Sequence, residues 1–220
     1  MKYSYLDIGC GGGIFASSAA RLPTTSSVTA IDPTPEVIKV AKEHQRSDPL
    51  LSQKGRLNYL NCSVEELGSK LESTNKQKFD IVTLFEVVEH IDKPAAFLRQ
   101  ALAHLKPGGW LVGSTIARHP VSYFTTKLVA EAPWPIGVVP QGTHDWNKYV
   151  NASEMREWFE KENKVSAELY PESTAQVKHV GTRYGELVVE GCVYLPLIGW
   201  KWVPKSAEYG NYFFGVQKLR

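Results

Sequence analysis

Short apolar runs alternate with amphipathic stretches along the first half of the chain. Apolar runs of four to eight residues bounded by turn residues are typical of buried strands, and apolar positions three or four apart are typical of helices. The pattern predicts strands at 3–8, 28–31, 57–62, 79–85 and 110–115. It predicts helices at 14–21, 35–45 and 94–105, and a short helix after the capping pattern of residues 63–66.

Strands that alternate with helices at this spacing predict an α/β fold with a doubly wound, mostly parallel sheet and helices on both faces. After residue 115 the pattern changes. Residues 118–145 are largely apolar and contain four prolines, a further helix is predicted at 151–162, and strands are predicted in 165–220, most clearly at 211–217. We expect one domain over 1–220, with 118–145 as an inserted segment.

Composition narrows the class of protein. The chain has 220 residues, 43% of them hydrophobic, and a net charge of +2, which suits one globular domain and gives no sign of a nucleic-acid partner. Cys10, Cys62 and Cys192 show no C-x-x-C spacing, which favours a reducing compartment. The sequence contains no apolar run of the roughly 20 residues that a membrane-spanning helix needs.

A glycine-rich loop, "GCGGG", follows the first predicted strand. Glycine lets a backbone approach a ligand closely, and Asp32, 25 residues after Asp7, is placed at the end of the next strand to accept ribose hydroxyls. Loop and acid together predict a cofactor that contains adenosine; the alternative is a plain turn between strand and helix. A dinucleotide fingerprint would need glycine where Ile14 stands, which disfavours an NAD-dependent oxidoreductase.

The stretch "TLFEVVEHID" places Glu86, Glu89 and His90 directly after a buried strand that ends at Phe85. If these residues continue as a helical turn, positions i, i+3 and i+4 share one face. Two carboxylates and an imidazole there would suit Mg²⁺ or a similar divalent cation, which would also relieve the repulsion between the carboxylates. The alternative is a structural role, or a general base, for the Glu-His pair.

Asp7-x-Gly9-x-Gly11-x-Gly13, Asp32 and "LKPGG" (105–109) together resemble the class I S-adenosylmethionine-dependent methyltransferases. The resemblance implies a seven-stranded sheet, with Asp7 and the loop glycines near the methionine part of the cofactor. It also implies that Asp32 holds the ribose and that Phe85 packs on the cofactor. The acid that often binds adenine is replaced here by Cys62 or Ser63, so we expect Ser63 or backbone amides in that role.

"CSVEEL" (62–67), "FEVVEH" (85–90), "PQGTHDW" (140–146) and "NYFFGVQK" (211–218) resemble the ubiquinone-biosynthesis O-methyltransferases, especially their mitochondrial branch. That family methylates hydroxyls of polyprenylated dihydroxybenzoate and of demethylubiquinol. The resemblance implies a divalent cation on Glu86, Glu89 and His90, and His90 is also the candidate catalytic base. His144 and Asp145 receive no chemical role from the sequence.

Three other functions remain to be weighed: another small-molecule methyltransferase, a nucleic-acid N-methyltransferase and a non-catalytic cofactor-binding module. The second is disfavoured because "LFEV" stands where such enzymes usually carry an [N/D/S]-P-P-[aromatic] motif. The third stays open because the chain starts just before the first strand, without the helices and the presequence that the mitochondrial family carries.

Residues 119–139 place Val121, Phe124, Leu128 and Val129 near helical spacing, followed by Trp134, Ile136, Val138 and Val139. This apolar segment suits either a lid over the substrate or a contact with the membrane interface. By resemblance, we expect a peripheral protein on the matrix side of the mitochondrial inner membrane, with partners in a ubiquinone-biosynthesis complex.

Overall fold

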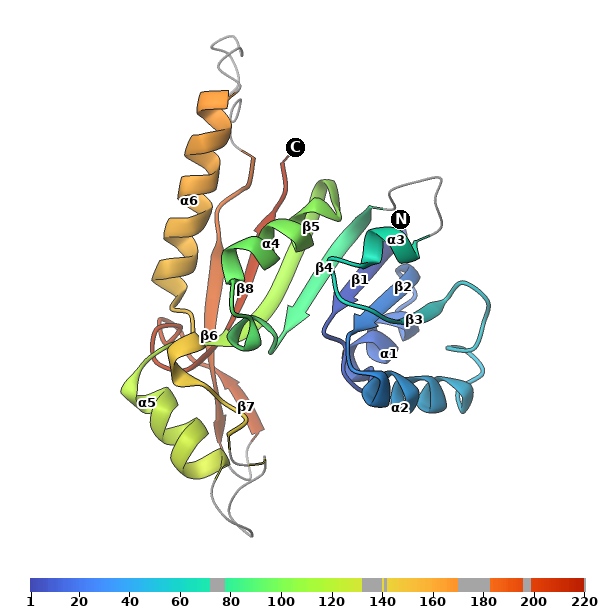
Figure 1. The fold of residues 1–220 in the computed structure, drawn as a ribbon, viewed down its shortest axis with the longest axis horizontal. Helices are drawn as coiled ribbons and strands as arrows, with labels where there is room; N and C mark the ends of the chain where they lie inside the picture. Colours follow the sequence, from blue (N-terminus) through green and yellow to red (C-terminus); the bar gives the residue numbers. More distant parts are fainter. Residues whose placement is uncertain (72–77, 132–139, 141, 170–182, 196–198, 220) are drawn as a thin grey trace. The chain divides into compact units, whose positions relative to one another are not determined.

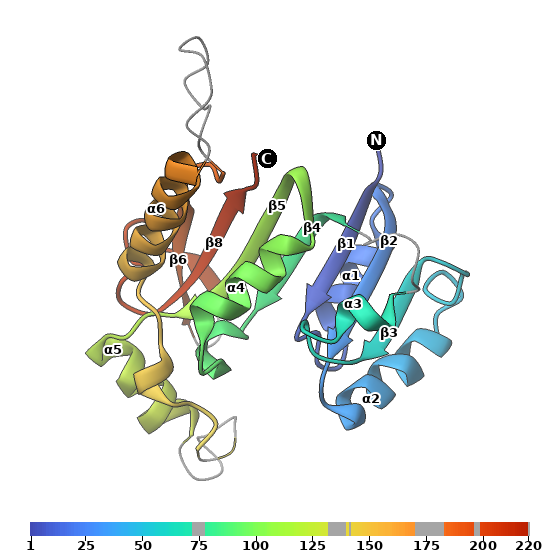
Figure 2. The same cartoon turned by 45° about the horizontal axis from the view of Figure 1, so that its top comes forward.

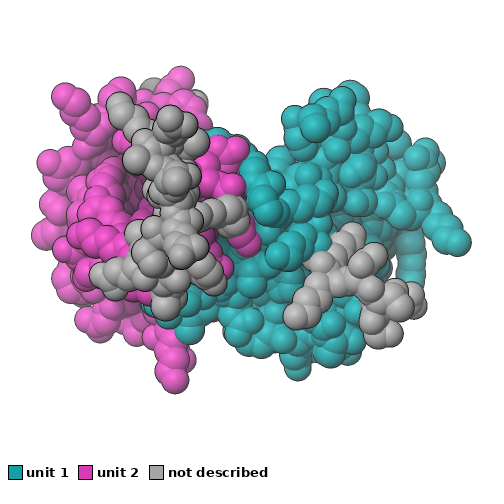
Figure 3. Space-filling view, turned by 90° about the horizontal axis from the view of Figure 1, so that it is seen from above, with its two compact units in different colours: residues 1–85, 95–112, 220 teal, residues 86–94, 113–219 magenta. Residues whose placement is uncertain are grey.

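The computed structural model describes residues 1–71, 78–131, 140, 142–169, 183–195 and 199–219. The chain divides into two compact units, which have different colours in Figure 3. Unit 1 holds residues 1–85 and 95–112, and unit 2 holds residues 86–94 and 113–219. Strand β5 (Leu105–Ile116) begins in unit 1 and ends in unit 2.

Unit 1 alternates strands and helices along the chain (Figure 1). Its other elements are β1 (Tyr3–Ile8), α1 (Ile14–Arg21), β2 (Thr25–Asp32), α2 (Pro35–Arg46), β3 (Leu57–Asn61), α3 (Leu67–Lys70), β4 (Phe79–Phe85) and α4 (Pro94–Ala103). Strand β1 pairs in parallel with β2 and β4, and β2 pairs in parallel with β3. The order β3-β2-β1-β4-β5 confirms the predicted doubly wound arrangement, with its switch point between β1 and β4.

The core of unit 1 explains why these elements form. On α1, Ala16, Ala19 and Ala20 lie at i, i+3 and i+4, and all three are buried. Their small side chains let the helix pack closely on β2, and α2 packs on β2 and β3 (Figure 2). The cluster also contains buried residues of the strands and of α2: Tyr5, Val28, Ala30, Ile38, Ala41, Leu57 and Tyr59.

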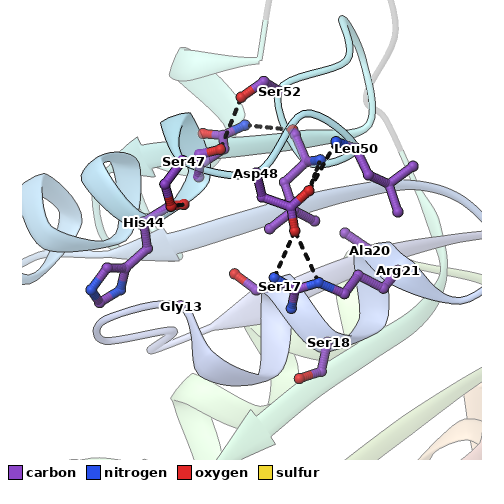
Figure 4. A network of polar contacts seen from close by, with 12 residues as sticks. Gly13, Ser17, Ser18, Ala20, Arg21, His44, Ser47, Asp48, Leu50 and Ser52 are labelled. Atoms are coloured by element: carbon purple, nitrogen blue, oxygen red, sulfur yellow. Dashed lines mark hydrogen bonds and ion pairs between the residues drawn. The ribbon is translucent and has the colours of Figure 1, made fainter.

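Asp48 fastens the turn after α2 to α1 (Figure 4). Its Oδ2 accepts hydrogen bonds from Arg21 Nε at 3.1 Å and Nη2 at 2.8 Å, and its Oδ1 accepts one from the backbone amide of Leu50 at 2.9 Å. The Arg21 side chain, helped by these backbone amides, lowers the pKa of Asp48. Two helices separated by a strand are thereby held together at their ends.

Unit 2 contains mostly antiparallel strands and one long helix. Its elements are the 3₁₀ turn η1 (Val88–His90), α5 (Pro120–Tyr123), the π-helical η2 (Phe124–Ala130), the 3₁₀ turn η3 (Trp146–Lys148), α6 (Ala152–Leu169), β6 (Val188–Leu195), β7 (Gly199–Trp202) and β8 (Asn211–Gln217). Strand β6 pairs in antiparallel fashion with β7 and β8, in the order β5-β8-β6-β7. The strand order of the described chain therefore has eight strands, one more than expected, because β7 pairs with the end of β6.

Element boundaries differ from the prediction where tertiary contacts decide them. Strand β5 begins at Leu105, five residues before the predicted start, and so takes in "KPGG". Gly108 has φ +80°, and a Cβ on Gly109 would lie 2.8 Å from the carbonyl oxygen of Asp80, so both glycines are needed inside this strand. Thr34, the residue before α2, makes no side-chain cap on that helix; the Thr34 backbone N–H donates to Asp32 Oδ1 at 2.9 Å.

Candidate functional site

The glycine loop of unit 1 lies between β1 and α1 at the carboxyl end of the strand. Gly9, Gly11 and Gly13 all have positive φ angles, of 72°, 50° and 80°. The loop is attached to the next strand, because the amides of Gly9 and Cys10 donate to the carbonyl of Ile31 at 2.8 and 3.0 Å. The predicted loop is thus in place at the switch point, where open α/β sheets bind ligands.

Tyr59 of β3 supports the far end of this loop and was not predicted. A Cβ on Gly13 would lie 2.1 Å from the Tyr59 hydroxyl, so residue 13 must be glycine for space as well as for φ. The hydroxyl also lies 3.1 Å from Ser17 Oγ. The sequence offers no signal for this contact beyond an aromatic residue in a strand.

Asp32 ends β2, as predicted, and its carboxylate is already partly engaged. Oδ2 accepts a hydrogen bond from the amide of Gly11 at 3.0 Å, and Oδ1 accepts one from the amide of Thr34 at 2.9 Å. A carboxylate offers about four acceptor positions, so two remain. Asp32 can therefore both brace the glycine loop and accept further donors.

Asp7 is buried, with 2% of its surface exposed. Oδ1 accepts a hydrogen bond from Thr83 Oγ1 at 2.7 Å, while Oδ2 is buried without a partner among the described residues. Burial raises the pKa of Asp7 to about 7, with a further increase from the charge of Asp32, against the lowering effect of the Thr83 hydroxyl. A buried oxygen without a donor at this position is suited to a donor or cation supplied by a ligand.

Phe85 and Ser63 are both engaged within unit 1. The ring of Phe85 packs on Phe15 of α1, with centroids 4.6 Å apart. Ser63 and Glu66 form the two predicted reciprocal hydrogen bonds, since Ser63 Oγ accepts the Glu66 amide at 3.4 Å and Glu66 Oε2 accepts the Ser63 amide at 3.0 Å, but they close a turn before α3, which begins at Leu67. The Ser63 hydroxyl keeps its own proton as a donor, and its contact with adenine stays a prediction.

The two glutamates of the "EVVEH" stretch meet in unit 2. Glu89 is 2% exposed and accepts a hydrogen bond from Thr115 Oγ1 at 2.7 Å, and Ser114 Oγ donates to Glu86 Oε1 at 2.5 Å. The two carboxyl groups are also hydrogen-bonded to each other. Burial, followed by the charge of Glu86, raises the pKa of Glu89 to about 8. Ser114 and Thr115, on β5, were not predicted to take part.

The backbone that achieves this meeting differs from the expected helical turn. The turn η1 begins at Val88, and Glu86 precedes it with φ +54°, a conformation that is uncommon for residues other than glycine. The His90 side chain is more than a third exposed, and the burial of its remaining part, followed by the charge of His144, lowers its pKa. Over the described chain, no three His, Cys, Asp or Glu side chains are arranged to hold one metal ion. The expected helical face is therefore wrong at Glu86, and metal binding by Glu86, Glu89 and His90 stays a prediction.

Glu131 organises a second polar cluster in unit 2, and sequence reasoning missed its role. Its side chain is 4% exposed and pairs with Lys127 Nζ at 2.8 Å. It also accepts the backbone amides of Gly142 at 2.8 Å and His144 at 2.7 Å. The available signal was the spacing of Lys127 and Glu131, four residues apart in an otherwise apolar stretch.

The apolar residues of the same segment face outward. Val121 is 51% exposed, and Phe124 and Leu128 are each 57% exposed. Residues 132–139, which include the predicted Trp134, Ile136, Val138 and Val139, lie outside the described residues, as does the side chain of Val129. No helix among the described residues is long and apolar enough to cross a membrane.

Comparisons with known proteins, by sequence and by fold, place the chain in one class. A family model described as "Methyltransferase domain" matches residues 2–163. Two solved structures are similar in fold. One is the magnesium protoporphyrin IX methyltransferase from Synechocystis PCC 6803 with bound SAH (TM-score 0.61, 12% identity, 99% of this chain and 74% of that chain). The other is an N-methyltransferase from Bradyrhizobium japonicum WM9 in complex with S-adenosyl-l-homocysteine (TM-score 0.53, 14% identity, 100% and 80%). The chain is a methyltransferase domain of class I type.

The curated relatives identify a family within this class. The chain is 39% identical over 215 residues to the mitochondrial ubiquinone biosynthesis O-methyltransferase of Candida albicans, and 36% identical over 219 residues to that of Saccharomyces cerevisiae. These matches span 98% and 99% of this chain but only 58% and 61% of the two relatives. Against the enzyme of Albidiferax ferrireducens, identity is 33% over 213 residues, which is 97% of this chain and 71% of that protein. The chain belongs to the ubiquinone biosynthesis O-methyltransferase family.

Proposed function

We propose that this protein transfers a methyl group from S-adenosylmethionine to an aryl hydroxyl of a polyprenylated catechol or quinol in ubiquinone biosynthesis. The observation that carries the proposal is the match, over 97–99% of the chain, to proteins named ubiquinone biosynthesis O-methyltransferase. The chain spans about 60% of the length of the mitochondrial relatives, so the activity of the whole protein is part of the proposal.

The cofactor site is proposed on unit 1, at the carboxyl ends of β1 and β2. Gly9, Gly11 and Gly13 would pass the backbone close to the methionine part of S-adenosylmethionine, and the unused acceptor positions of Asp32 would take the ribose hydroxyls. The ammonium group of the cofactor would supply the donor that Asp7 Oδ2 lacks within the described chain. Phe85 and Ser63 are the proposed contacts to the rest of the cofactor.

The acid pair of unit 2 is the proposed site for Mg²⁺ or a similar cation. Two carboxyl groups that hydrogen-bond to each other, one of them with a raised pKa, form a place where a cation can replace a proton. Glu86 and Glu89 fit this role on geometry, and His90 is the proposed third ligand, or the base if it does not bind the metal. A bound cation would lower the pKa of the acceptor hydroxyl.

The proposed chemistry sets what the protein must supply. A phenol has a pKa of roughly 10, so forming phenolate at neutral pH costs about 4 kcal/mol. The sulfonium is already a good leaving group, so the chain mainly has to remove one proton and hold oxygen, methyl carbon and sulfur in line. Such positioning contributes roughly 7–11 kcal/mol in well-oriented reactions.

The proposed location of the protein in the cell is inferred from its relatives. Two of the named relatives are mitochondrial, and the exposed Val121, Phe124 and Leu128 provide an apolar face that suits peripheral contact with the inner membrane or with an isoprenoid tail. We propose the matrix side, where other proteins of ubiquinone biosynthesis would be its partners.

The direct test is an assay with S-adenosylmethionine, Mg²⁺ and a catechol acceptor that carries a short prenyl chain, read by mass spectrometry. A product 14 mass units heavier than the acceptor (one added CH₂) is expected. Binding of S-adenosylhomocysteine without product from any catechol or quinol would instead favour a cofactor-binding module, and methylation of unrelated small molecules alone would favour another methyltransferase activity.

A further inference from the structure

His144, in the "GTHDW" stretch, is held by the buried carboxylate of Glu131. Glu131 Oε1 accepts the backbone amide of His144 at 2.7 Å and lies 3.0 Å from its ring nitrogen Nδ1. On the other side, Lys127 Nζ donates to Glu131 Oε2 and to the carbonyl oxygen of His144, each at 2.8 Å. The residue is thus fixed by its amide, its carbonyl and its ring.

The ionisation of Glu131 decides which ring nitrogen carries the proton. Burial alone would raise the pKa of this carboxyl, but Lys127, the two backbone amides and the His144 ring outweigh it and lower the pKa to about 2. At neutral pH the carboxylate therefore only accepts hydrogen bonds. Nδ1 must be the protonated nitrogen, which leaves Nε2 of the neutral ring with a free lone pair.

The ring orientation is fixed a second time by Tyr149. The His144 ring meets the Tyr149 ring edge to face, at 6.4 Å between centroids and an interplanar angle of 86°. The Tyr149 hydroxyl is in turn hydrogen-bonded to Thr126 Oγ1 at 2.8 Å, and both residues are buried. The His144 side chain keeps 15% of its surface exposed. An oriented, partly buried imidazole with a small exposed portion suits a general base.

The turn that follows His144 is tied to the residues after the acid pair, because Lys148 Nζ donates a hydrogen bond to Asp92 Oδ1 at 2.5 Å. Tyr149, whose ring meets that of His144, has its pKa raised to about 12 by burial and then by the charges of Glu89, Glu131 and Glu86. If His90 binds a cation through its lone pair, it cannot take up the proton that the acceptor hydroxyl loses. The reaction then needs another proton acceptor in the same unit.

We propose that His144 is this acceptor, with Glu131 as the residue that positions it; this rests on the proposed function. As the aryl oxygen attacks the methyl carbon, the hydroxyl proton passes to His144 Nε2. The new O–C bond forms while the C–S bond breaks, and the electron pair of that bond stays on sulfur as S-adenosylhomocysteine is formed. The imidazolium then returns the proton to water.

The first test replaces His144 by Asn. The Asn amide nitrogen occupies the place of Nδ1 and can still donate to Glu131, so the loop stays attached while Nε2 is lost. We expect kcat for an ordinary catechol to fall by roughly 10²–10⁴-fold, with the Kd for S-adenosylhomocysteine within twofold of the wild type. His44→Asn, the same change at an exposed position of α2, is the control.

The acidity of the acceptor separates a base from a structural residue. 4-Nitrocatechol is largely ionised near neutral pH and needs little help to lose its proton. We expect the His144→Asn defect to shrink by at least tenfold on this acceptor. An equal defect on both acceptors, or no defect on either, overturns the inference while leaving the proposed function intact. A wild type that methylates neither acceptor overturns the proposed function and the inference with it.

Glu131→Gln tests the positioning role. The change keeps the size of the side chain but removes the negative charge that fixes the proton on Nδ1. In ¹⁵N-histidine spectra of the wild type we expect His144 with Nδ1 protonated and Nε2 unprotonated, and loss of this pattern in Glu131→Gln. Glu157→Gln, in the exposed pair with Lys161, is the matched control. A wild type with the proton on Nε2 at neutral pH would refute the assignment.

Discussion

The carboxylate of Asp32 accepts a hydrogen bond from the backbone amide of Gly11, 3.0 Å away. The residue proposed to hold the ribose therefore also holds the loop that is proposed to hold the methionine part of the cofactor. In the proposed site, binding energy at one end of the cofactor would therefore depend on the geometry at the other end, through this single side chain.

Replacing Asp32 by Ala is expected to weaken binding of S-adenosylhomocysteine by roughly 1.5–3 kcal/mol, the scale of a hydrogen bond to a charged group. The loss should be at the upper end, because the Gly11 amide loses its partner as well. Isothermal titration calorimetry measures it. Asp48→Ala, which removes a partly exposed carboxylate with a similar bracing role, is the control, and an unchanged Kd for Asp32→Ala would overturn the ribose assignment.

Asp7 should make the cofactor-free protein less stable as pH rises. The pKa of this carboxyl is raised from 3.8 to about 7 in the folded state, so its stabilising contribution is complete below about pH 4 and is lost as pH rises toward 7. Asp7→Asn keeps an acceptor for Thr83 and cannot ionise. Urea unfolding at pH 5 and pH 8 should show the variant gaining on the wild type by a few kcal/mol at the higher pH. Parallel curves for the two proteins would contradict this.

Glu86→Ala is expected to abolish the dependence of turnover on Mg²⁺ while leaving the affinity for S-adenosylhomocysteine nearly unchanged. The physical reason is that Glu86 is one half of the carboxyl pair, so its removal leaves the cation with the single carboxylate of Glu89. Initial rates of chelator-treated protein against added Mg²⁺ provide the measurement, with Glu160→Ala on α6 as a control. If turnover and its metal dependence are unchanged, Glu86 has no place in the site.

The exposed apolar face is expected to bind membranes. Changing both Phe124 and Leu128, each 57% exposed, to Ser removes two side chains that would each contribute roughly 1.5–3 kcal/mol on burial. Co-sedimentation with phosphatidylcholine vesicles should fall by roughly tenfold or more. Val165→Ser, at a position 53% exposed on α6, controls for surface polarity. Unchanged sedimentation with a raised KM for the prenylated acceptor would indicate a lid instead.

Gly13 and Gly11 offer a matched pair for the loop. Both have positive φ, so alanine at either position should cost roughly 1–2 kcal/mol of stability. At Gly11 the added Cβ meets nothing within 4 Å, whereas at Gly13 it meets the Tyr59 hydroxyl. Urea unfolding should therefore show Gly13→Ala at least about 1 kcal/mol less stable than Gly11→Ala. Equal losses would mean that Tyr59 moves away at little cost.

The sequence predicted those parts of the molecule that local patterns determine. Strands β1, β4 and β8 have the predicted bounds, since turn residues or a change of polarity mark both ends. The reciprocal hydrogen bonds of Ser63 and Glu66 likewise follow from a local pattern. The glycine loop and Asp32 were placed correctly because the order of elements fixes where they lie.

Contacts between distant residues could not be predicted in the same way. Tyr59 supports Gly13 across 46 residues, and Ser114 and Thr115 reach the two glutamates from a strand that follows an entire helix. Glu131 was visible only as a charge in an apolar stretch, because its partners at 142 and 144 lie beyond residues that give no periodic signal. The left-handed backbone at Glu86 was likewise hidden, since Glu is an ordinary helix former.

The positive φ of Glu86 gives a way to judge other chains of this family. Glycine at this position would relieve the backbone by roughly 1 kcal/mol, yet it would leave Glu89 without its companion carboxyl. A homologue that carries glycine at this position should therefore have less backbone strain there and should lack the acid pair. The amino acid at this one position would therefore separate candidate enzymes from proteins that share the fold but have another function.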